Sequence, residues 1–316
     1  MEERLFLRGI ARERRYVVRG HAQMPAFVEA NFANAAFSGL YQAAMAAGVT
    51  LQRARVEMFS QLGRTFHGHR IEDGGERCCF SAYRHSVQYY TKLMIIEEIT
   101  VTAFQQHTRI VGCEETKQAI CIDPGDEAER IVEILERRGL QLKAIALTHA
   151  HLDHVGGVAA LKKLQPKAQI HLHEGDEFMY QALPEQPGWI GIPRSQWAAL
   201  GFTFEQPPPV DHHWVDGEKY SVGKLEFEVL HCPGHTPGHV VLYERNEGVV
   251  FVGDVLFAGS IGRTDLPGGS TEQLLSSIKT KLMTLDDDVK VYSGHGPVTT
   301  IGEERLTNPF LTHRFI

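Results

Sequence analysis

The sequence predicts an αββα sandwich, an α/β fold in which two mixed β-sheets pack together and helices cover the outer faces. Two observations lead to this fold class. From Met94 onward, two successive runs of strand-like segments are each followed by helical segments. In the first run, the heptapeptide Thr148–His154 places three imidazoles and a carboxylate directly after an apolar segment. So many metal-capable side chains at the end of a buried strand are hard to explain as core or as ordinary surface.

The first run of elements extends to about residue 173. Its predicted strands are rich in β-branched and apolar residues; they cover Ile95–Phe104, Thr108–Cys113, Gln118–Ile122, Lys143–Leu147 and Gln169–His173. A helix is predicted at Asp126–Arg138, where Gly139 provides the C-terminal stop. A second helix should run from about Val155 to Leu164, because Pro166 cannot continue it.

The second run begins after a long segment, 182–213, that is expected to be irregular because of its many prolines. Strands are predicted at 218–222, 225–231, 239–244, 248–252 and Val289–Ser293. A helix should span about Thr271–Leu282, with Ser270 or Thr271 as its N-cap. Each run therefore supplies one sheet and helices to cover it.

The composition is that of an ordinary globular protein, with 43% apolar and 22% charged residues among 316. No apolar run approaches the roughly 18 residues of a membrane span, so we expect no membrane partner. The formal net charge of −7 argues against nucleic acid as the main partner. The five cysteines lack disulfide or zinc-finger spacing, and the sequence shows no n-region and h-region pattern of a signal peptide, so we expect a reducing, cytoplasmic location. These cysteines are Cys78, Cys79, Cys113, Cys121 and Cys232.

Charge divides the chain into two segments at about Met94. Residues 1–93 are basic and rich in Arg, whereas residues 94–316 are acidic and use both Lys and Arg. Two interpretations of 1–93 stay open: a helical arm for docking or targeting, and a poorly ordered extension or upstream sequence before a start at Met94. The lack of a motif or strong periodicity favours the second. We expect 94–316 to be the hydrolase domain and 1–93 an N-terminal extension of unknown role.

The heptapeptide Thr148–His154 has the pattern of a metal site. Alternation along the extended chain sends His149 and His151 to the same side, where they can share one metal ion. Asp153 and His154 come as the chain turns into a helix, so they can reach a second ion. Imidazole and carboxylate groups suit zinc, iron or manganese.

Three further candidate ligands occur in the second half of the chain. His235 lies in a Pro/Gly-rich loop between two strands, Asp254 ends an apolar strand, and His295 follows another. A carboxylate in Asp254's position would be costly unless it were paired or coordinated. Each feature alone is weak evidence, but together with the heptapeptide they form a specific set. For His239, four residues after His235, we expect a supporting or structural role and not a role as a metal ligand.

These motifs resemble the metallo-β-lactamase superfamily, and within it the glyoxalase II (hydroxyacylglutathione hydrolase) group. The resemblance is to short bacterial proteins without the long C-terminal helical domain, and it covers about 95–316. It rests on the segments Val101-Thr102-Ala103-Phe104, Asp123-Pro124-Gly125, THAHLDHVGG, HCPGHTPGHVV, VGDVLF, GRTDLPGG, GHGP and Asn308-Pro309-Phe310. One departure is local: Gln106-His107-Thr108 stands where relatives usually carry Gln-Asn-Cys. Nothing in 1–93 matches the family.

The resemblance implies a binuclear centre. One metal ion would be bound by three histidines: His149, His151 and His235. The other would be bound by Asp153, His154 and His295, and Asp254 would bridge the two ions. The implied cofactors are two divalent metal ions, with zinc favoured and iron or manganese as alternatives.

The ligand chemistry indicates a catalytic site. Histidine and aspartate ligands without cysteine leave coordination positions for water and substrate. Two metal ions roughly 3.5–4 Å apart can share a water, lower its pKa toward about 7 and polarise a carbonyl. The bridging hydroxide would add to a thioester carbonyl, and thiolate is a good leaving group. Asp153 and Asp254 are the candidate catalytic residues, with Asp153 also orienting the hydroxide.

The expected function is therefore metal-dependent hydrolysis of a thioester such as S-lactoylglutathione, which gives a hydroxy acid and glutathione. Two alternatives stay open: a mononuclear-iron persulfide dioxygenase, and a hydrolase of lactone or β-lactam rings. The partner is a small-molecule, glutathione-derived thioester, and the sequence does not define the oligomeric state. Candidate contacts for the glutathione carboxylates are Arg263, Lys279, Lys281 and Arg305.

Overall fold

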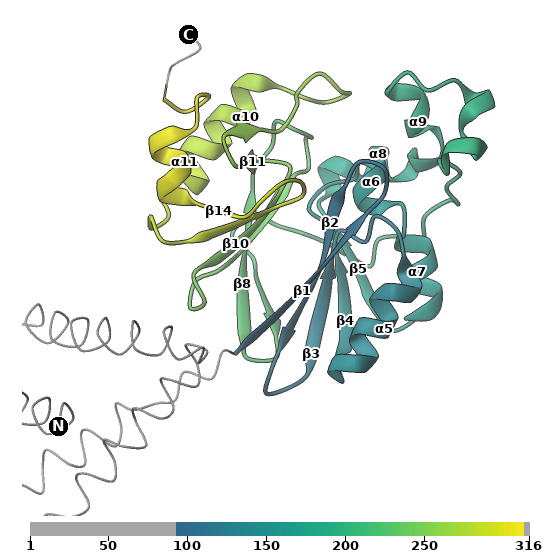
Figure 1. Cartoon of the computed structure of the whole chain (residues 1–316), viewed down its shortest axis with the longest axis horizontal. Coiled ribbons are helices and arrows are strands. Elements are labelled where there is room, and N and C mark those ends of the chain that lie inside the picture. Colours follow the sequence, from purple (N-terminus) through teal and green to yellow (C-terminus); the bar gives the residue numbers. More distant parts are fainter. Residues whose placement is uncertain (1–92, 313–316) are drawn as a thin grey trace, which may run out of the picture. The chain divides into compact units, whose positions relative to one another are not determined.

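The computed structural model describes residues 93–312 (Figure 1). Residues 1–92 and 313–316 lie outside the described part of the chain. The expected N-terminal extension at 1–93 falls almost wholly on these residues and stays a prediction. Within the described residues, no helix is both long enough and apolar enough to cross a membrane.

The first sheet has six strands in the order β1-β2-β3-β4-β5-β6. Its strands are β1 (Met94–Val101), β2 (Gln106–Cys113), β3 (Gln118–Ile122), β4 (Gln141–Ala146), β5 (Gln169–Leu172) and β6 (His212–His213). The β1–β2 and β2–β3 pairs are antiparallel. The pairs from β3 to β6 are parallel, so the sheet is mixed.

The second sheet also has six strands, in the order β14-β13-β10-β9-β8-β7. Its strands are β7 (Lys219–Val222), β8 (Leu225–His231), β9 (Val240–Glu244), β10 (Val249–Gly253), β13 (Lys290–Ser293) and β14 (Thr299–Thr300). Only β10 and β13 pair in parallel; the other neighbours are antiparallel. A small ribbon of β11 (Leu256–Phe257) and β12 (Ser260–Ile261) follows β10.

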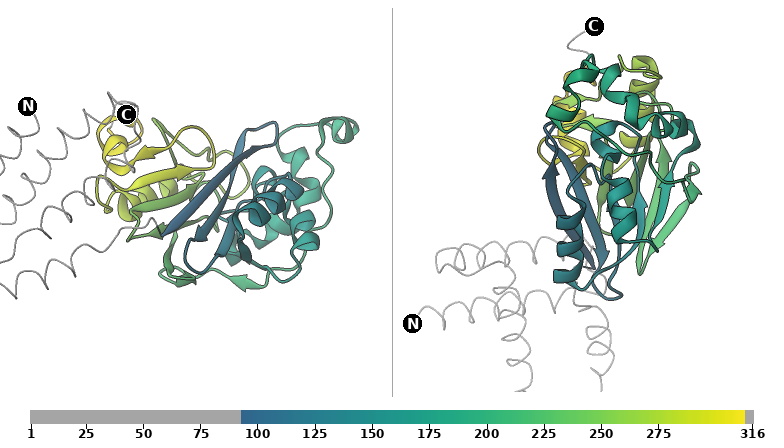
Figure 2. Two further views of the ribbon diagram at one scale, coloured as in Figure 1. Left: turned by 60° about the horizontal axis from the view of Figure 1, so that its bottom comes forward. Right: turned by 90° about the vertical axis from the view of Figure 1, so that its right-hand side faces the viewer.

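Helices lie on the outer faces of both sheets (Figures 1 and 2). The first sheet is covered by α5 (Ala128–Arg138) and α7 (Val158–Leu164), whose apolar side chains share a core with it. The second sheet is covered by α10 (Thr271–Ser277), its π-helical continuation η5 (Ile278–Leu282) and α11 (Ile301–Thr307). This arrangement confirms the predicted αββα sandwich.

The middle layer of the core lies between the sheets. In β3, Ile120 and Ile122 belong to the core shared with the second sheet, whereas Ala119 and Cys121 belong to the core under the helices. This two-residue alternation is what a strand buried on both faces requires. From the second sheet, Phe227 and Phe251 enter the middle layer. Burying each such side chain contributes about 1.5–3 kcal/mol.

The predicted helix at Val155–Leu164 is in fact two helices. The first turn, α6 (Leu152–Val155), starts earlier, and Gly156 and Gly157 separate it from α7. A Cβ at Gly156 would lie 2.7 Å from the carbonyl oxygen of Gly125, and one at Gly157 would lie 2.8 Å from that of Pro124. The break therefore lets the chain pass close to the turn after β3.

The segment 182–213, expected to be irregular, contains short helical turns and a strand. These elements are η2 (Leu183–Glu185), α9 (Gln186–Trp189), η3 (Arg194–Gln196), η4 (Ala198–Leu200) and β6. Before them, η1 (Glu174–Asp176) and α8 (Glu177–Gln181) follow β5. Sequence periodicity could not show them because each is shorter than two helical turns or a typical strand.

Candidate metal centre

The seven predicted ligands come together where both sheets end, near α6 in the upper part of Figure 1. His149 and His151 lie between β4 and α6, and Asp153 and His154 belong to α6. The other three come from the second half of the chain: His235 between β8 and β9, Asp254 after β10, and His295 after β13. Sites in α/β sheets commonly form beyond the carboxyl ends of parallel strands, and β4, β10 and β13 all contribute here.

His149, His151 and His235 form the three-histidine cluster. Each offers a nitrogen within 4.8 Å of those of the other two. His151 Nδ1 and His235 Nε2 are 2.8 Å apart, and all three side chains are buried. Burial, followed by the neighbouring imidazoles, lowers the pKa of His149 far below its usual value and that of His151 to about 3. These shifts favour the neutral form of His149 and His151, which is the form that binds a metal ion.

Asp153, His154 and His295 form the mixed cluster. His295 Nε2 lies 3.2 Å from Asp153 Oδ2, and His154 Nε2 lies 3.8 Å from the same oxygen. Asp153 and His295 are partly exposed, whereas His154 is completely buried. The solvent-facing side of the site is thus the Asp153–His295 side.

Asp254 lies between the two clusters. Its Oδ1 is 3.4 Å from His154 Nε2, and its Oδ2 is 3.6 Å from both His235 Nε2 and His295 Nε2. Burial alone would favour the neutral acid, but the surrounding imidazoles, His154 above all, hold the pKa of Asp254 far below its usual range. A carboxylate in this position can contact groups bound at both clusters.

Several buried atoms at the centre have no hydrogen-bond partner among residues 93–312. They are Nε2 of His149, Nε2 of His151, Nε2 of His154 and Oδ1 of Asp254. A buried polar atom left unsatisfied costs about 1–3 kcal/mol, so four in one place need an explanation. Divalent metal ions would satisfy all four, and nitrogen and oxygen donors suit zinc, iron or manganese. The residues therefore fit the metal ions that the motif predicted.

Asp123, directly after β3, is a supporting residue that the sequence indicated only as part of the turn Asp123-Pro124-Gly125. Its carboxylate accepts hydrogen bonds from Thr148 N (2.7 Å) and Thr148 Oγ1 (2.6 Å), and its Oδ2 lies 2.9 Å from His154 Nδ1. Holding Nδ1 leaves Nε2 of His154 directed at the mixed cluster, which is how carboxylates orient metal-binding histidines. Its position after a buried strand, the signal that identified Asp254, could have identified Asp123 as well.

The loop that carries His295 is held by β2. His107 N donates to Gly294 O (2.8 Å), and His107 Nε2 lies 3.1 Å from Gly296 O. The buried Arg109 donates to Ser293 O (2.6 Å) and pairs with Glu98 (2.9 Å). His107, the middle residue of the Gln106-His107-Thr108 segment that departs from the family pattern, therefore contacts this loop directly.

His239 is outside the ligand groups but supports two of their members. Its Nε2 accepts a hydrogen bond from Asp254 N (3.0 Å), and its ring stacks on that of His149 with centroids 4.7 Å apart. Of the other histidines considered, His173 stacks on His231 at 4.1 Å, and His171 packs against Trp214. Neither is part of the ligand groups found among the described residues.

The candidate cations for a glutathione substrate lie in different settings. Arg263 donates twice to Asp265 (2.7 and 2.8 Å), and its carbonyl oxygen accepts from His235 Nδ1 (2.7 Å). Lys281 is bound by Asp216, and Arg305 by the carbonyl oxygens of Met283 and Leu285 and by Asp287. Lys279 belongs to η5 on the outer face of the second sheet. Only Arg263 is joined directly to a predicted ligand.

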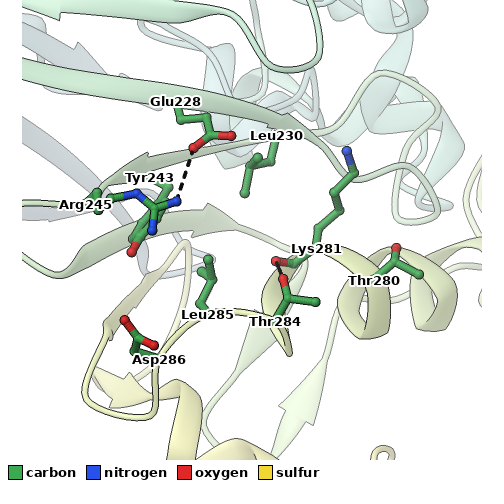
Figure 3. A pocket seen from close by; sticks show the side chains of 9 residues that line it. All are labelled: Glu228, Leu230, Tyr243, Arg245, Thr280, Lys281, Thr284, Leu285 and Asp286. Carbon is green, nitrogen blue, oxygen red and sulfur yellow. Dashed lines mark hydrogen bonds and ion pairs between the residues drawn. The ribbon is translucent and has the colours of Figure 1, made fainter.

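A cleft of about 280 Å³ lies apart from the metal cluster, between β8, β9 and η5 (Figure 3). Lys281 and Arg245 contribute positive charge there, and Glu228 and Asp286 contribute negative charge. None of the seven predicted ligands lines it. The cleft is therefore not the metal centre.

Comparison with known proteins agrees with this geometry. Residues 102–295 match the model of the metallo-beta-lactamase superfamily. The chain belongs to this superfamily. Hydroxyacylglutathione hydrolase GloC of Haemophilus influenzae is 45% identical over 221 residues, which is 70% of this chain and 100% of the relative. The predicted superfamily, glyoxalase II resemblance and hydrolase class are thus confirmed.

Two solved structures extend this similarity to the metallo-beta-lactamase fold. The BLEG-1 B3 metallo-beta-lactamase is 38% identical with a TM-score of 0.60, and it covers 69% of this chain and 100% of its own. TTHA1623, solved in a di-iron-bound form, is also 38% identical, with a TM-score of 0.58, and the match covers 68% of this chain and 100% of that chain. The chain is a metallo-hydrolase of this superfamily.

Proposed function

We propose that the chain hydrolyses the thioester of an acylglutathione such as S-lactoylglutathione and releases a hydroxy acid and glutathione. The proposal includes two divalent metal ions, one at the three-histidine cluster and one at the mixed cluster, with Asp254 between them. The observation that carries it is the convergence of unsatisfied buried ligand atoms from both clusters around Asp254. The name of the H. influenzae relative supports the choice of substrate.

The bound ions would supply a water acidified near neutral pH and a Lewis acid for the thioester carbonyl. Asp153 and Asp254 are the proposed catalytic residues. Asp153 lies on the solvent-facing side, where its carboxylate can accept a hydrogen bond from the attacking water and orient it. Asp254, held as a carboxylate, would bridge the ions. Because thiolate leaves readily, the reaction needs no strong general acid.

The finer assignments are part of the same proposal. Zinc is the favoured metal, and the di-iron-bound form of TTHA1623 supports iron as the alternative to measure. Arg263 is the candidate contact for a glutathione carboxylate, which would replace the Asp265 carboxylate as the acceptor of its two hydrogen bonds. The catalytic domain is 94–316. The reducing cytoplasm is the proposed location, since Cys113, Cys121 and Cys232 are free thiols.

The test uses the purified full chain, analysed for metals and assayed with S-D-lactoylglutathione by loss of thioester absorbance. We expect close to two metal ions per chain and turnover that falls at least about 1,000-fold in Asp153→Ala and Asp254→Ala. Asp216→Ala, which removes a surface carboxylate bound to Lys281, is the matched control and should retain activity. Oxygen uptake with glutathione persulfide, one iron per chain and no thioester loss would overturn the proposal in favour of a dioxygenase.

A further inference from the structure

We propose that Asp176 is a positioning residue for the three-histidine cluster, joining through one buried carboxylate the two loops that carry its histidines. This inference rests on the metal assignment of the proposed function. Asp176 ends η1, after β5, and has no exposed surface. It is absent from the ligand groups found among the described residues, so it acts through its neighbours.

The carboxylate of Asp176 accepts three hydrogen bonds from two separate loops. Oδ2 accepts from Ala150 N (3.1 Å) and from Thr236 Oγ1 (2.7 Å). Oδ1 accepts from Gly238 N (2.6 Å). Ala150 lies between His149 and His151, and Thr236 directly follows His235. Each histidine of the cluster is therefore next in sequence to a residue that Asp176 binds.

The two loops belong to different sheets. The first follows β4 of the first sheet, and the second connects β8 to β9 of the second sheet. A backbone hydrogen bond from Val240 N to Thr148 O (2.8 Å) also joins them, but it lies outside the histidines on both loops. Asp176 makes its contacts beside the histidines themselves. It thereby sets the distance between loops that must converge on one ion.

The peptide groups on both sides of Ala150 are fixed. Asp176 accepts from Ala150 N, and the buried Gln186 Nε2 donates to Ala150 O (2.7 Å). Both polar groups of the residue between His149 and His151 therefore have side-chain partners. This restrains the backbone rotations that direct the two imidazoles.

The turn that carries Asp176 packs closely against the loop at Gly238. A Cβ at Gly238 would lie 2.5 Å from Asp176 N and 2.8 Å from Asp176 Oδ1. A Cβ at Gly175 would lie 3.0 Å from the Gly238 backbone. If the carboxylate is removed, the buried N–H groups of Ala150 and Gly238 lose their partners, and the loops must shift to recover them.

The mixed cluster is held by other residues, which makes the inference selective. Asp123 orients His154, and His107 and Arg109 hold the loop of His295. Loss of Asp176 should therefore weaken the ion at the three-histidine cluster and leave the ion at the mixed cluster nearly unchanged. A role in general stability alone would not separate the two ions.

The test is cobalt binding to the metal-free full chain, followed by absorbance and by competition with a chelator. Asp176→Asn keeps the shape but turns one acceptor oxygen into an amide that cannot accept. We expect one of the two ions to lose about 10- to 100-fold in affinity, and the other to change less than about threefold. His295→Ala, which removes a ligand of the mixed cluster, identifies the spectrum of the ion at the three-histidine cluster.

Two further variants keep the inference open to refutation. Thr236→Val removes one of the three hydrogen bonds and should give a smaller loss at the same ion, even if Asp176→Asn fails to fold. Asp216→Asn, which alters a carboxylate bonded to His231 N and Lys281, should bind both ions as the unaltered chain does. Equal loss at both ions, or no loss at either, in a folded Asp176→Asn or Thr236→Val chain would overturn the inference.

The metal readout is independent of substrate. An unaltered chain that binds two cobalt ions but does not cleave thioesters would contradict the proposed reaction and still support the role of Asp176 if the variants behave as expected. An unaltered chain that binds no cobalt would overturn the metal assignment, and with it this inference.

Discussion

Gly294→Ala places a methyl group at the centre of the metal site. Gly294 follows β13 and precedes His295. A Cβ at this position would lie 2.7 Å from His154 Cε1 and would also press on Asp254 Oδ1, closer than real Cβ atoms approach. Both neighbours are predicted ligands, one for the mixed cluster and one between the clusters. The substitution therefore tests whether this arrangement performs the reaction.

The magnitude follows from the overlap. Carbon atoms pack at about 3.5–4.0 Å, so His154 or the loop must move by about 1 Å. Overpacking a buried site in this way lowers the free energy of unfolding by about 1–3 kcal/mol. A displacement of about 1 Å at a reacting centre lowers the rate about 100-fold. We expect kcat/KM for S-D-lactoylglutathione to fall by about that factor, with a loss of bound metal.

Gly296→Ala is the matched control in the same loop. Gly296 has φ +76°, and a Cβ there would meet nothing within 4 Å. Its substitution introduces backbone strain of about 1–2 kcal/mol without contacting a ligand. Kinetics and metal analysis of Gly296→Ala should show nearly normal activity and metal content, and thermal unfolding should show only the small loss of stability caused by the strain. Normal kcat/KM and metal content in Gly294→Ala, or an equal loss in Gly296→Ala, would refute the reasoning.

Three further outcomes are expected. Burial of the imidazole, and to a lesser extent the neighbouring His212, lowers the pKa of His171 to about 4 in the folded chain. As pH falls below about 6.5, His171 therefore becomes protonated in the unfolded chain before it does in the folded chain. In metal-free protein, this difference in protonation should lower the free energy of unfolding by at most about 3 kcal/mol between pH 6.5 and 4. The loss, measured by urea unfolding, should be smaller in His171→Phe; identical pH profiles for the two chains would contradict the prediction. Burial raises the pKa of Cys232 to about 12, so peptide mapping after iodoacetamide at pH 8 should find it alkylated in denatured but not in native protein. Free zinc at about 1,000 times its Kd should stabilise the fold by about 4 kcal/mol, measured as a shift in the unfolding midpoint relative to chelated protein; an unchanged midpoint would argue against binding to the native state.

Much of the fold could be predicted because its signals are local. The alternation and turn residues around Gln118–Ile122 and around 225–231 gave both strands their observed bounds. Four of the seven predicted ligands fall within Thr148–His154, so their proximity needs no knowledge of the tertiary structure. For His235, Asp254 and His295, the glycines and apolar strands before them indicated where the chain could present a polar group.

The supporting residues could not be predicted because their roles depend on distant contacts. Asp176 resembles any acid in a short turn until Ala150 and Thr236 are brought to it. The same limit explains the excess of candidate substrate cations. Lys281 looked available in sequence, but Asp216, from a different part of the chain, binds it in the structure.

The distribution of ligands over both sheets has a consequence for biosynthesis. His149, His151, Asp153 and His154 are synthesised early in the domain, whereas His295 follows β13, near the end of the described residues. β13 pairs in parallel with β10, the strand that ends beside Asp254. A nascent chain still lacking β13 has the ligands of the three-histidine cluster but an incomplete mixed cluster. For the proposed two-metal centre, a ribosome-stalled chain ending before β13 would carry the complete three-histidine cluster but would lack His295 of the mixed cluster.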